Sequence, residues 1–347
     1  MPASHEINEG SMVTHKAFRS RHRRRPRPRI RPRGVMECGV LEYCAKAEKH
    51  PRSGLEILKV LPIGVVQLFS GLSAPAADDQ KTAQPAVTRI AEIERDLQGR
   101  LGVAILDTAN GRSIDYHAKD RFPMCSTFKW LAAAAVLKRV DQNQERLDRK
   151  LSYGPADMLE WAPITEKHVQ EGSMTLDALC AAAIEYSDNT AGNLLLQTIG
   201  GPHGLTEFVR SIGDPITRLD RNEPTLNTAI KGDERDTTTP ASMLKDLKSL
   251  LVDQELSAGS QQKLEGWLIK NTTGDKRLRA GLPSTWQIGD KTGTGPKNGA
   301  TGDVAIARPP NRAPILIVVY TVESSASSDK INQAFADVGK VVGETFR

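Results

Sequence analysis

The sequence predicts an α/β (α+β) domain with two lobes, preceded by a leader. Strand-like segments lie near both ends of the domain, at residues 100–107 and 315–322, whereas the chain from Thr127 to about Leu251 is mainly helical. If the end segments join one sheet, the chain begins and finishes in an α/β lobe, and its middle forms a helical lobe. A cleft between two such lobes is a usual place for a ligand site. We expect the leader at residues 1–76 and the folded domain at 77–347, with the α/β lobe at about 84–120 and 270–347 and the helical lobe at about 121–269.

The leader has the composition of a disordered segment. The run from Arg19 to Arg33 contains nine arginines separated by prolines and a few other residues, and such a run repels itself. It is either a tail for nucleic acid or acidic lipid, or upstream sequence that precedes the true start codon. The second interpretation is favoured.

An apolar stretch from Ile57 to Leu72 follows this basic region, and small residues follow it at Ala74 to Ala76. This is the pattern of a secretory signal segment, and the stretch is too short and broken for a comfortable membrane span. Its distance from Met1 is far greater than in an ordinary signal peptide, which again favours a later start. We expect the domain to be exported, to the periplasm or the medium, after this segment is removed.

Periodicity and turn signals predict the elements of the α/β lobe in order. Ile90, Ile93 and Leu97 share one face of a helix. Two strand-like segments follow, and Asn110-Gly111 between them is a hairpin signal. The predicted elements are a helix at 87–97, strands at 100–107, 113–117, 286–290, 304–307 and 315–322, and a final helix at about 328–345.

The net charge of +5 belongs to the leader. Of the 47 Lys and Arg and the 42 Asp and Glu, 14 and 6 fall in residues 1–76, which leaves 33 basic and 36 acidic residues in the domain. The domain is therefore slightly acidic and carries no basic field for nucleic acid.

Cysteine and histidine spacing argues against a zinc site. Cys125 and Cys180 are the two cysteines of the domain and could form at most one bridge, and no CxxC spacing occurs. The three histidines of the domain, at positions 117, 168 and 203, form no HxH or HExxH pattern. We expect no metal and no cofactor.

Ser126 and Lys129 form the first motif that carries chemistry. Their i, i+3 spacing at the start of a predicted helix places the hydroxyl and the amine on one face. Serine is a poor nucleophile until a base takes its proton, and a desolvated lysine can act as that base. The same spacing also describes a helix N-cap beside a solvated lysine, so this motif alone decides little.

Two further motifs follow along the chain. Ser187-Asp188-Asn189 offers a second hydroxyl and an amide, although such a tripeptide is more often a polar turn. Lys291-Thr292-Gly293 is either a glycine-rich hairpin or a strand edge against which a substrate could lie. In the second case the lysine and threonine would offer a charge and a hydroxyl to a substrate carboxylate.

In this order the three motifs resemble the set shared by class A β-lactamases and penicillin-binding proteins. A fourth, from Arg221 to Asn227 (RNEPTLN), matches the R-x-E-P-x-L-N signature of the class A enzymes, and residues 232–240 resemble the end of their omega loop. The resemblance covers about residues 84–347. It implies the two-lobed serine β-lactamase fold, with an antiparallel sheet flanked by helices, an all-helical lobe and an active site in the cleft between them.

The resemblance also implies how the omega loop is held. Arg221 is expected to pair with Asp236 across the neck of the loop, and the peptide bond from Glu223 to Pro224 is expected to be cis, which is accessible before proline. The loop would then close the floor of the active site and aim Glu223 inward.

Other site residues are carried over position by position. Trp161 falls where the family has an aromatic at the cleft rim, and Arg277 falls where some members place the arginine that meets the substrate carboxylate. The expected catalytic residues are Ser126, Lys129, Ser187, Glu223 and Asn227. The expected substrate-binding residues are Asn189, Lys291, Thr292, Gly293, Thr294, Arg277 and Trp161, with the backbone N–H groups of Ser126 and Thr294 as the oxyanion hole.

The cysteines depart from the pairings known in the family. Some members bridge the cysteine before the nucleophile to one just beyond the K-T-G motif, but that position here is Gly295. The usual partner of the cysteine at position 180 falls at Ala133. We therefore expect two free, buried thiols.

The activity that the resemblance implies is hydrolysis of the β-lactam amide of penicillins, and of cephalosporins, which confers resistance. Ser126 would form an acyl-enzyme, and Glu223 with Asn227 would activate the water that releases it. The base for acylation is either Lys129 or Glu223 acting through a water. Ser187 would pass a proton to the ring nitrogen, and the enzyme would act as a monomer on a small β-lactam substrate.

Two other functions are compatible with part of the sequence. A penicillin-binding D,D-peptidase acting on peptidoglycan would share Ser126, Lys129 and the K-T-G motif, but not Glu223 and Asn227 in this loop. A nucleic-acid-binding protein that uses the arginine-rich leader would bind in a salt-dependent way. It gives no reason for four ordered motifs in an acidic domain.

Overall fold

The computed structural model describes residues 77–296 and 299–346, and side chains from Gln84 onward. The arginine-rich run, the apolar stretch at 57–72 and the two leader cysteines lie outside the described residues.

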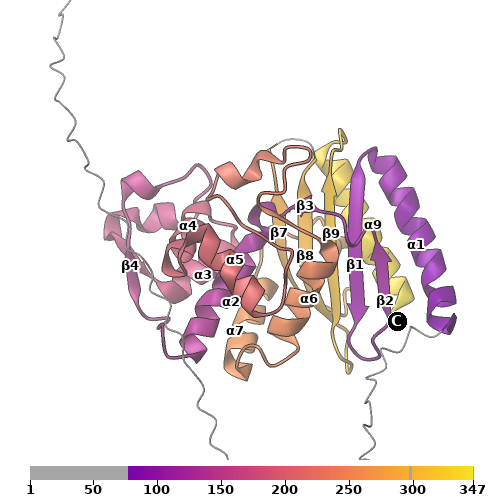
Figure 1. Ribbon diagram of the computed structural model, residues 1–347, viewed down its shortest axis with the longest axis horizontal. Helices are drawn as coiled ribbons and strands as arrows, with labels where there is room; N and C mark the ends of the chain where they lie inside the picture. The colour runs from indigo at the N-terminus through magenta and orange to yellow at the C-terminus, as the bar shows by residue number, and fades with distance from the viewer. Residues whose placement is uncertain (1–76, 297–298, 347) are drawn as a thin grey trace, which may run out of the picture. The chain divides into compact units, whose positions relative to one another are not determined.

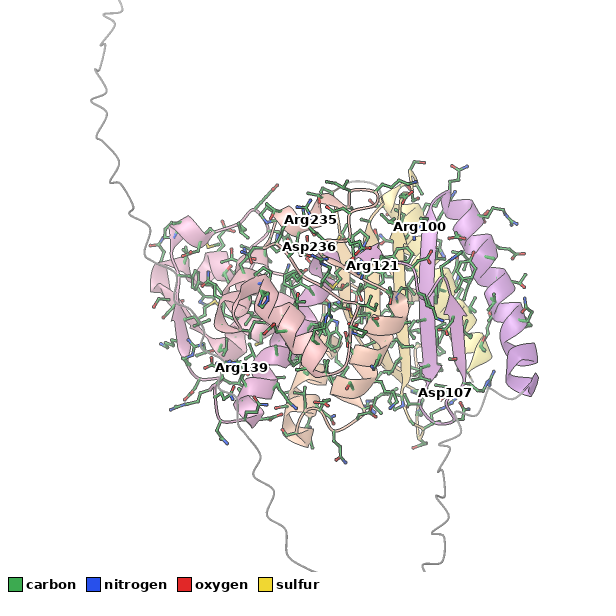
Figure 2. The ribbon with its side chains drawn as sticks, in the orientation of Figure 1. Arg100, Asp107, Arg121, Arg139, Arg235 and Asp236 are labelled. Atoms are coloured by element: carbon green, nitrogen blue, oxygen red, sulfur yellow. The ribbon has the colours of Figure 1, made fainter. Side chains whose placement is uncertain are left out.

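One five-stranded antiparallel sheet is built from both ends of the domain (Figure 1). Its strand order is β2-β1-β9-β8-β7. The first strand pairs with the last along its whole length, from Arg100 opposite Val322 to Asp107 opposite Ile315. Arg100 and Asp107 lie at opposite ends of this strand (Figure 2). The strands are β1 Arg100–Asp107, β2 Ser113–Tyr116, β7 Gln287–Thr294, β8 Thr301–Arg308 and β9 Ile315–Val322.

Helices cover both faces of the sheet, which explains why β9 (ILIVVYTV) is almost entirely apolar rather than alternating, with Thr321 as the exception. Ile317 and Val319 pack in the cluster formed with α1 (Ala77–Leu97) and α9 (Ser328–Thr345). Their neighbours Val318 and Tyr320 face the opposite cluster, which includes residues of α6 (Pro240–Leu251). A short helix, α8 (Leu278–Gly281), packs against α9.

The second lobe is built around α2 (Phe128–Asp141), whose residues from Phe128 to Leu137 are all buried. A helix that is apolar on every side must be surrounded, and α2 contacts four other helices. Those helices are α3 Leu176–Glu185, α4 Asn189–Thr198, α5 Gly201–Ser211 and α7 Ala258–Ile269. The N-terminus of this central helix is therefore held rigidly, and Ser126 lies just before it.

Short elements complete the fold and fasten the loops. They are β3 Phe122–Pro123, β4 Lys150–Ser152, β5 Ser173–Thr175, β6 Thr237–Thr238 and the 3₁₀ turns η1 Cys125–Thr127, η2 Pro155–Asp157, η3 Thr165–Glu171 and η4 Thr225–Thr228. The β3–β6 pair joins the segment before Ser126 to the segment after the omega loop.

The expected elements and the observed ones differ mainly at their ends. The first helix begins at Ala77 rather than residue 87, β2 ends at Tyr116 rather than His117, and β8 is longer than 304–307 at both ends. β7 continues past Asp290 to Thr294, because each of its residues pairs with β8. The K-T-G motif is therefore a strand edge and not a hairpin. Within residues 77–296 and 299–346, no helix combines the length and apolar character needed to cross a membrane.

Candidate active site

Ser126 lies in the 3₁₀ turn η1, at the entrance to α2. Cys125 immediately before it has a φ of 45°, in the left-handed region that non-glycine residues seldom adopt. Such strain is tolerated where the surroundings fix it, often at functional sites. β7 lies directly against this turn, since a Cβ on Gly293 would come within 2.6 Å of the Met124 carbonyl oxygen.

The Lys129 ammonium is fully buried and surrounded by oxygen atoms. Its Nζ lies 2.9 Å from Ser126 Oγ and 3.0 Å from Glu223 Oε1. It also donates to the Ser187 carbonyl at 2.9 Å and to Asn189 Oδ1 at 2.6 Å. Burial lowers the pKa of Lys129 from its usual value, and the neighbouring Glu223 opposes that shift.

Lys291 is the second buried cation of the site. Its Nζ donates to Ser187 Oγ at 3.0 Å and to the Thr292 carbonyl at 2.7 Å. Burial, followed by repulsion from Lys129, holds the pKa of Lys291 well below its usual value. Ser187 therefore lies between the two lysines, with its carbonyl on one and its hydroxyl on the other, and its φ of 57° is also left-handed.

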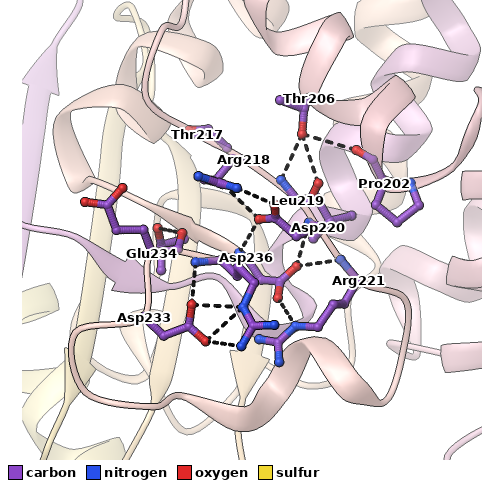
Figure 3. Close-up of polar contacts among 12 residues, drawn as sticks. Pro202, Thr206, Thr217, Arg218, Leu219, Asp220, Arg221, Asp233, Glu234 and Asp236 are labelled. Atoms are coloured by element: carbon purple, nitrogen blue, oxygen red, sulfur yellow. Dashed lines mark hydrogen bonds and ion pairs between the residues drawn. The ribbon is translucent and has the colours of Figure 1, made fainter.

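The omega loop is closed at its neck by Arg221 and Asp236, as expected (Figure 3). Arg221 Nε lies 2.6 Å from Asp236 Oδ2, while Asp236 Oδ1 accepts from the backbone N–H groups of Asp220 and Arg221. The Asp236 carbonyl in turn accepts from the Met124 N–H at 3.0 Å. The neck is thus bonded to the chain two residues before Ser126, and the Glu223–Pro224 bond inside the loop is cis, which confirms that prediction.

Both carboxylate oxygens of Glu223 and its backbone are hydrogen-bonded. Its Oε1 accepts from Ser126 Oγ at 3.1 Å, and its Oε2 accepts from Asn227 Nδ2 at 2.5 Å. Asn193 binds its backbone, accepting from the Glu223 N–H at 2.9 Å and donating to the Glu223 carbonyl at 3.0 Å. Asn193 is not among the site residues expected from the sequence. Its signal was its spacing, because it follows Asn189 by one helical turn on α4.

Arg277 is almost completely buried, with 8% of its surface exposed, and most of its donors are engaged. Nη1 binds the carbonyls of Gly293 at 3.0 Å and Gly302 at 2.8 Å, and Nε binds Asn332 Oδ1 at 3.1 Å. Nη2 donates to Thr294 Oγ1 at 2.6 Å. Burial lowers the pKa of Arg277 from its usual value. The arginine therefore underlies the end of β7 and orients Thr294.

A cavity of about 380 Å³ lies between the two lobes and is lined by several of the expected site residues. Its volume is suited to a small molecule. Trp161 stands at its rim with 56% of its surface exposed, and its Nε1 donates to the Tyr186 carbonyl at 3.0 Å. Thr273 also lines the cavity, although it is not among the site residues expected from the sequence. The lining residues are Ser126, Trp161, Ser187, Asn189, Asn227, Thr273, Arg277, Thr292 and Thr294.

Known proteins match this chain over most of the described residues. The sequence model of the β-lactamase enzyme family matches residues 85–346. A solved structure of an ancestral class A β-lactamase is 57% identical, with a TM-score of 0.74, covering 75% of this chain and 100% of that one. The chain belongs to the class A β-lactamases.

Natural β-lactamases are also similar in sequence. β-Lactamase AST-1 of Nocardia asteroides is 46% identical over 78% of this chain and 87% of that protein. β-Lactamase Toho-1 of Escherichia coli is 43% identical over 85% and 98%. These relatives establish this class A β-lactamase as a serine hydrolase of β-lactams with the expected two-lobed fold. They give no support to the D,D-peptidase alternative.

The two cysteines among the described residues of this β-lactamase are free and buried, which confirms that expectation. Cys125 is the first residue of the turn η1, next to Ser126, and Cys180 lies in α3. Burial raises the pKa of Cys125 to about 12 and also raises the pKa of Cys180. Both thiols are therefore inert in the folded protein.

Proposed function

We propose that this β-lactamase opens penicillins and cephalosporins through an acyl-enzyme on Ser126, which water directed by Glu223 then hydrolyses. The observation that carries the proposal is the position of one hydroxyl between two bases. Ser126 Oγ lies 2.9 Å from Lys129 Nζ and 3.1 Å from Glu223 Oε1. Both distances are within direct hydrogen-bond reach, as base catalysis requires.

The substrate carboxylate would bind at the end of β7. Thr292 and Thr294 offer hydroxyls to the cavity, while Arg277 and Lys291 supply positive charge beneath them. Trp161 and Asn189 would contact the rest of the substrate from the helical lobe, Asn189 by orienting the side-chain amide. Such an arrangement fixes the ring carbonyl near Ser126 before reaction, which lowers the entropic part of the barrier.

Acylation would begin when a base takes the Ser126 proton and the oxygen attacks the ring carbonyl. Lys129 is suited to this because its lowered pKa makes the neutral amine more available. Glu223 is the alternative base, directly or through a water. The backbone N–H groups of Ser126 and Thr294 would stabilise the oxyanion, each worth about 3–4 kcal/mol.

Cleavage of the amide bond leaves the ring nitrogen in need of a proton. Ser187 would donate it, and the Ser187 hydroxyl already contacts Lys291 Nζ at 3.0 Å. The proton lost by Ser187 would be replaced through the two neighbouring lysines. The acyl-enzyme then remains on Ser126 with the ring open.

Deacylation would use Glu223 as a general base toward water. Asn227 holds one carboxylate oxygen at 2.5 Å, which fixes the direction of the other toward Ser126. Attack of the activated water on the ester regenerates the Ser126 hydroxyl and releases the opened acid. Side chains and backbone supply every step, so we expect no metal or cofactor.

Two further expectations concern the location and the oligomeric state of the enzyme. We expect the mature enzyme to be exported after removal of the N-terminal segment, since β-lactams act outside the cytoplasm. We also expect a monomer, because the active site is complete within one chain.

A nucleophile test can be made with a chromogenic cephalosporin and residues 77–347. Ser126→Ala should abolish turnover and prevent any covalent adduct with a penicillin by mass spectrometry. Ser113→Ala, at an exposed position of β2, is the matched control and should behave as the unmodified enzyme. Residual turnover above about one part in a thousand by Ser126→Ala would exclude Ser126 as the nucleophile.

A further inference from the structure

Thr273 lines the active-site cavity and belongs to none of the four motifs. It lies in the loop between α7 and α8, and its Oγ1 is 2.5 Å from Thr292 Oγ1. Either hydroxyl could donate in that bond. The direction decides where the Thr292 proton points, and therefore whether Thr292 is ready to bind an anion.

Asn271 settles the direction. The Thr273 backbone N–H, whose proton cannot rotate, donates to Asn271 Oδ1 at 3.1 Å, so this oxygen faces Thr273. The other end of the amide, Nδ2, donates to Asp290 Oδ2 at 3.0 Å. If the amide were flipped, Asn271 Nδ2 would face the Thr273 N–H, and two hydrogen-bond donors would oppose each other. The orientation of the amide is therefore fixed.

The Thr273 hydroxyl therefore donates its single proton to Asn271 Oδ1, at 2.8 Å. It can only accept from Thr292. In the unliganded enzyme the Thr292 proton consequently points at Thr273 and away from the position of a substrate carboxylate. Thr292 can donate to that carboxylate only after its hydroxyl turns and the bond to Thr273 breaks.

We propose that Thr273 is a positioning residue that sets the direction of the Thr292 hydroxyl and so weakens ground-state binding of the substrate carboxylate. The inference rests on the proposed function of Thr292 and Thr294 as the carboxylate site. A hydrogen bond that must break on binding reduces affinity by its net value, about threefold to tenfold. Removing the acceptor at position 273 therefore tightens binding of anionic substrates only.

Equilibrium binding in a Ser126→Gly background tests this, because that enzyme cannot form the acyl adduct. The ligands are benzylpenicillin and its methyl ester, and the variants are Thr273→Val and Thr273→Ser. Thr273→Val is isosteric but accepts no hydrogen bond, and Thr273→Ser keeps the acceptor. Thr273→Ala serves as a second acceptor-free variant should valine reduce the melting temperature.

The expected result is a dissociation constant for benzylpenicillin that falls threefold to tenfold in Thr273→Val, with no change in Thr273→Ser or toward the ester. With Ser126 restored, the KM follows the dissociation constant while kcat stays within twofold. Unchanged or weaker binding by Thr273→Val, or an equal change toward the ester, would overturn the inference. If the starting enzyme binds acid and ester equally, the carboxylate site itself is wrong.

Discussion

Lys129 Nζ and Glu223 Oε1 lie 3.0 Å apart, and neither side chain is exposed to solvent. Two opposite charges taken out of water in this way stabilise a fold only weakly, because desolvation offsets their attraction. The arrangement instead presents two bases to one hydroxyl, that of Ser126. The omega loop and the helical lobe must both be in place for this pair to form, which makes it sensitive to changes elsewhere.

The neck of the omega loop should control Glu223 from a distance. Asp236→Ala leaves the partly buried Arg221 without its partner and frees two backbone donors. We expect a loss of about 3 kcal/mol in the free energy of unfolding and a slower deacylation step. Urea unfolding and single-turnover kinetics measure the two effects.

Asp233→Ala is the control for the neck. Asp233 pairs with the more exposed Arg235 in the same loop, and such exposed pairs contribute little to stability because water and salt screen them. An equal loss of stability in the two variants would show that the neck has no special role.

Gly293 should tolerate no side chain. Its missing Cβ would lie 2.6 Å from the Met124 carbonyl and 3.2 Å from Cys125 Cβ, so alanine must push β7 away from the nucleophile turn. We expect Gly293→Ala to lower kcat/KM about 100-fold, equivalent to about 2.7 kcal/mol of barrier. Gly154→Ala, where a Cβ meets no atom within 4 Å, should leave kcat/KM unchanged. A fully active Gly293→Ala enzyme would contradict the close fit.

Asp246 should make the fold less stable as the pH rises. Burial raises the pKa of Asp246 well above 3.8, and the negative charge of Asp214 raises it further, against Lys245 and Arg210. Because the folded pKa exceeds the unfolded one, this group's contribution to stability is complete below pH 3.8 and is lost as the pH rises toward the folded pKa.

In the variant Asp246→Asn the side chain cannot ionise, so its stability does not fall as the pH rises through this range. We expect it to be more stable than the unmodified enzyme at pH 7.5 by about 1–2 kcal/mol, and the advantage to shrink at pH 4.5. Urea unfolding at both pH values measures this difference. Asp96→Asn, at an exposed site, should show none. An advantage that grows toward low pH would contradict the assigned direction.

The reactivity of the two cysteine thiols tests whether they are buried and unpaired. In residues 77–347, Cys125 and Cys180 should resist a thiol reagent in the native state and both react after unfolding, because only the thiolate reacts and burial disfavours it. Fewer than two reactive groups in the unfolded, unreduced protein would reveal a disulfide.

Most of the sheet was predictable because its strands carry local signals. Residues 101–106 and 315–320 lack polar side chains apart from the Tyr320 hydroxyl, and the structure reproduces the strands predicted at 100–107 and 315–322 with the same ends. β7 was predicted too short because glycine and threonine after Asp290 suggest a turn. Its real extent follows from pairing with β8, a contact between distant segments.

Some residues of the site could likewise be predicted from local motifs, and others could not. Ser126, Lys129 and Glu223 stand in motifs, so their meeting could be inferred. Asn193 and Thr273 could not be assigned, because their roles depend on loops that approach from elsewhere in the chain. Arg277 was predicted to meet the substrate carboxylate, but most of its donors bind protein oxygens, a detail that only packing reveals.

The most direct test of the central claim is the fate of the acyl-enzyme in Glu223→Ala. With a chromogenic cephalosporin, the unmodified enzyme should turn over continuously. Glu223→Ala should release one equivalent of chromophore and then stall, with a stable adduct on Ser126 by mass spectrometry. Continued turnover by Glu223→Ala would show that another group directs the water. An unmodified enzyme that stalls after one equivalent would contradict the two-step mechanism altogether.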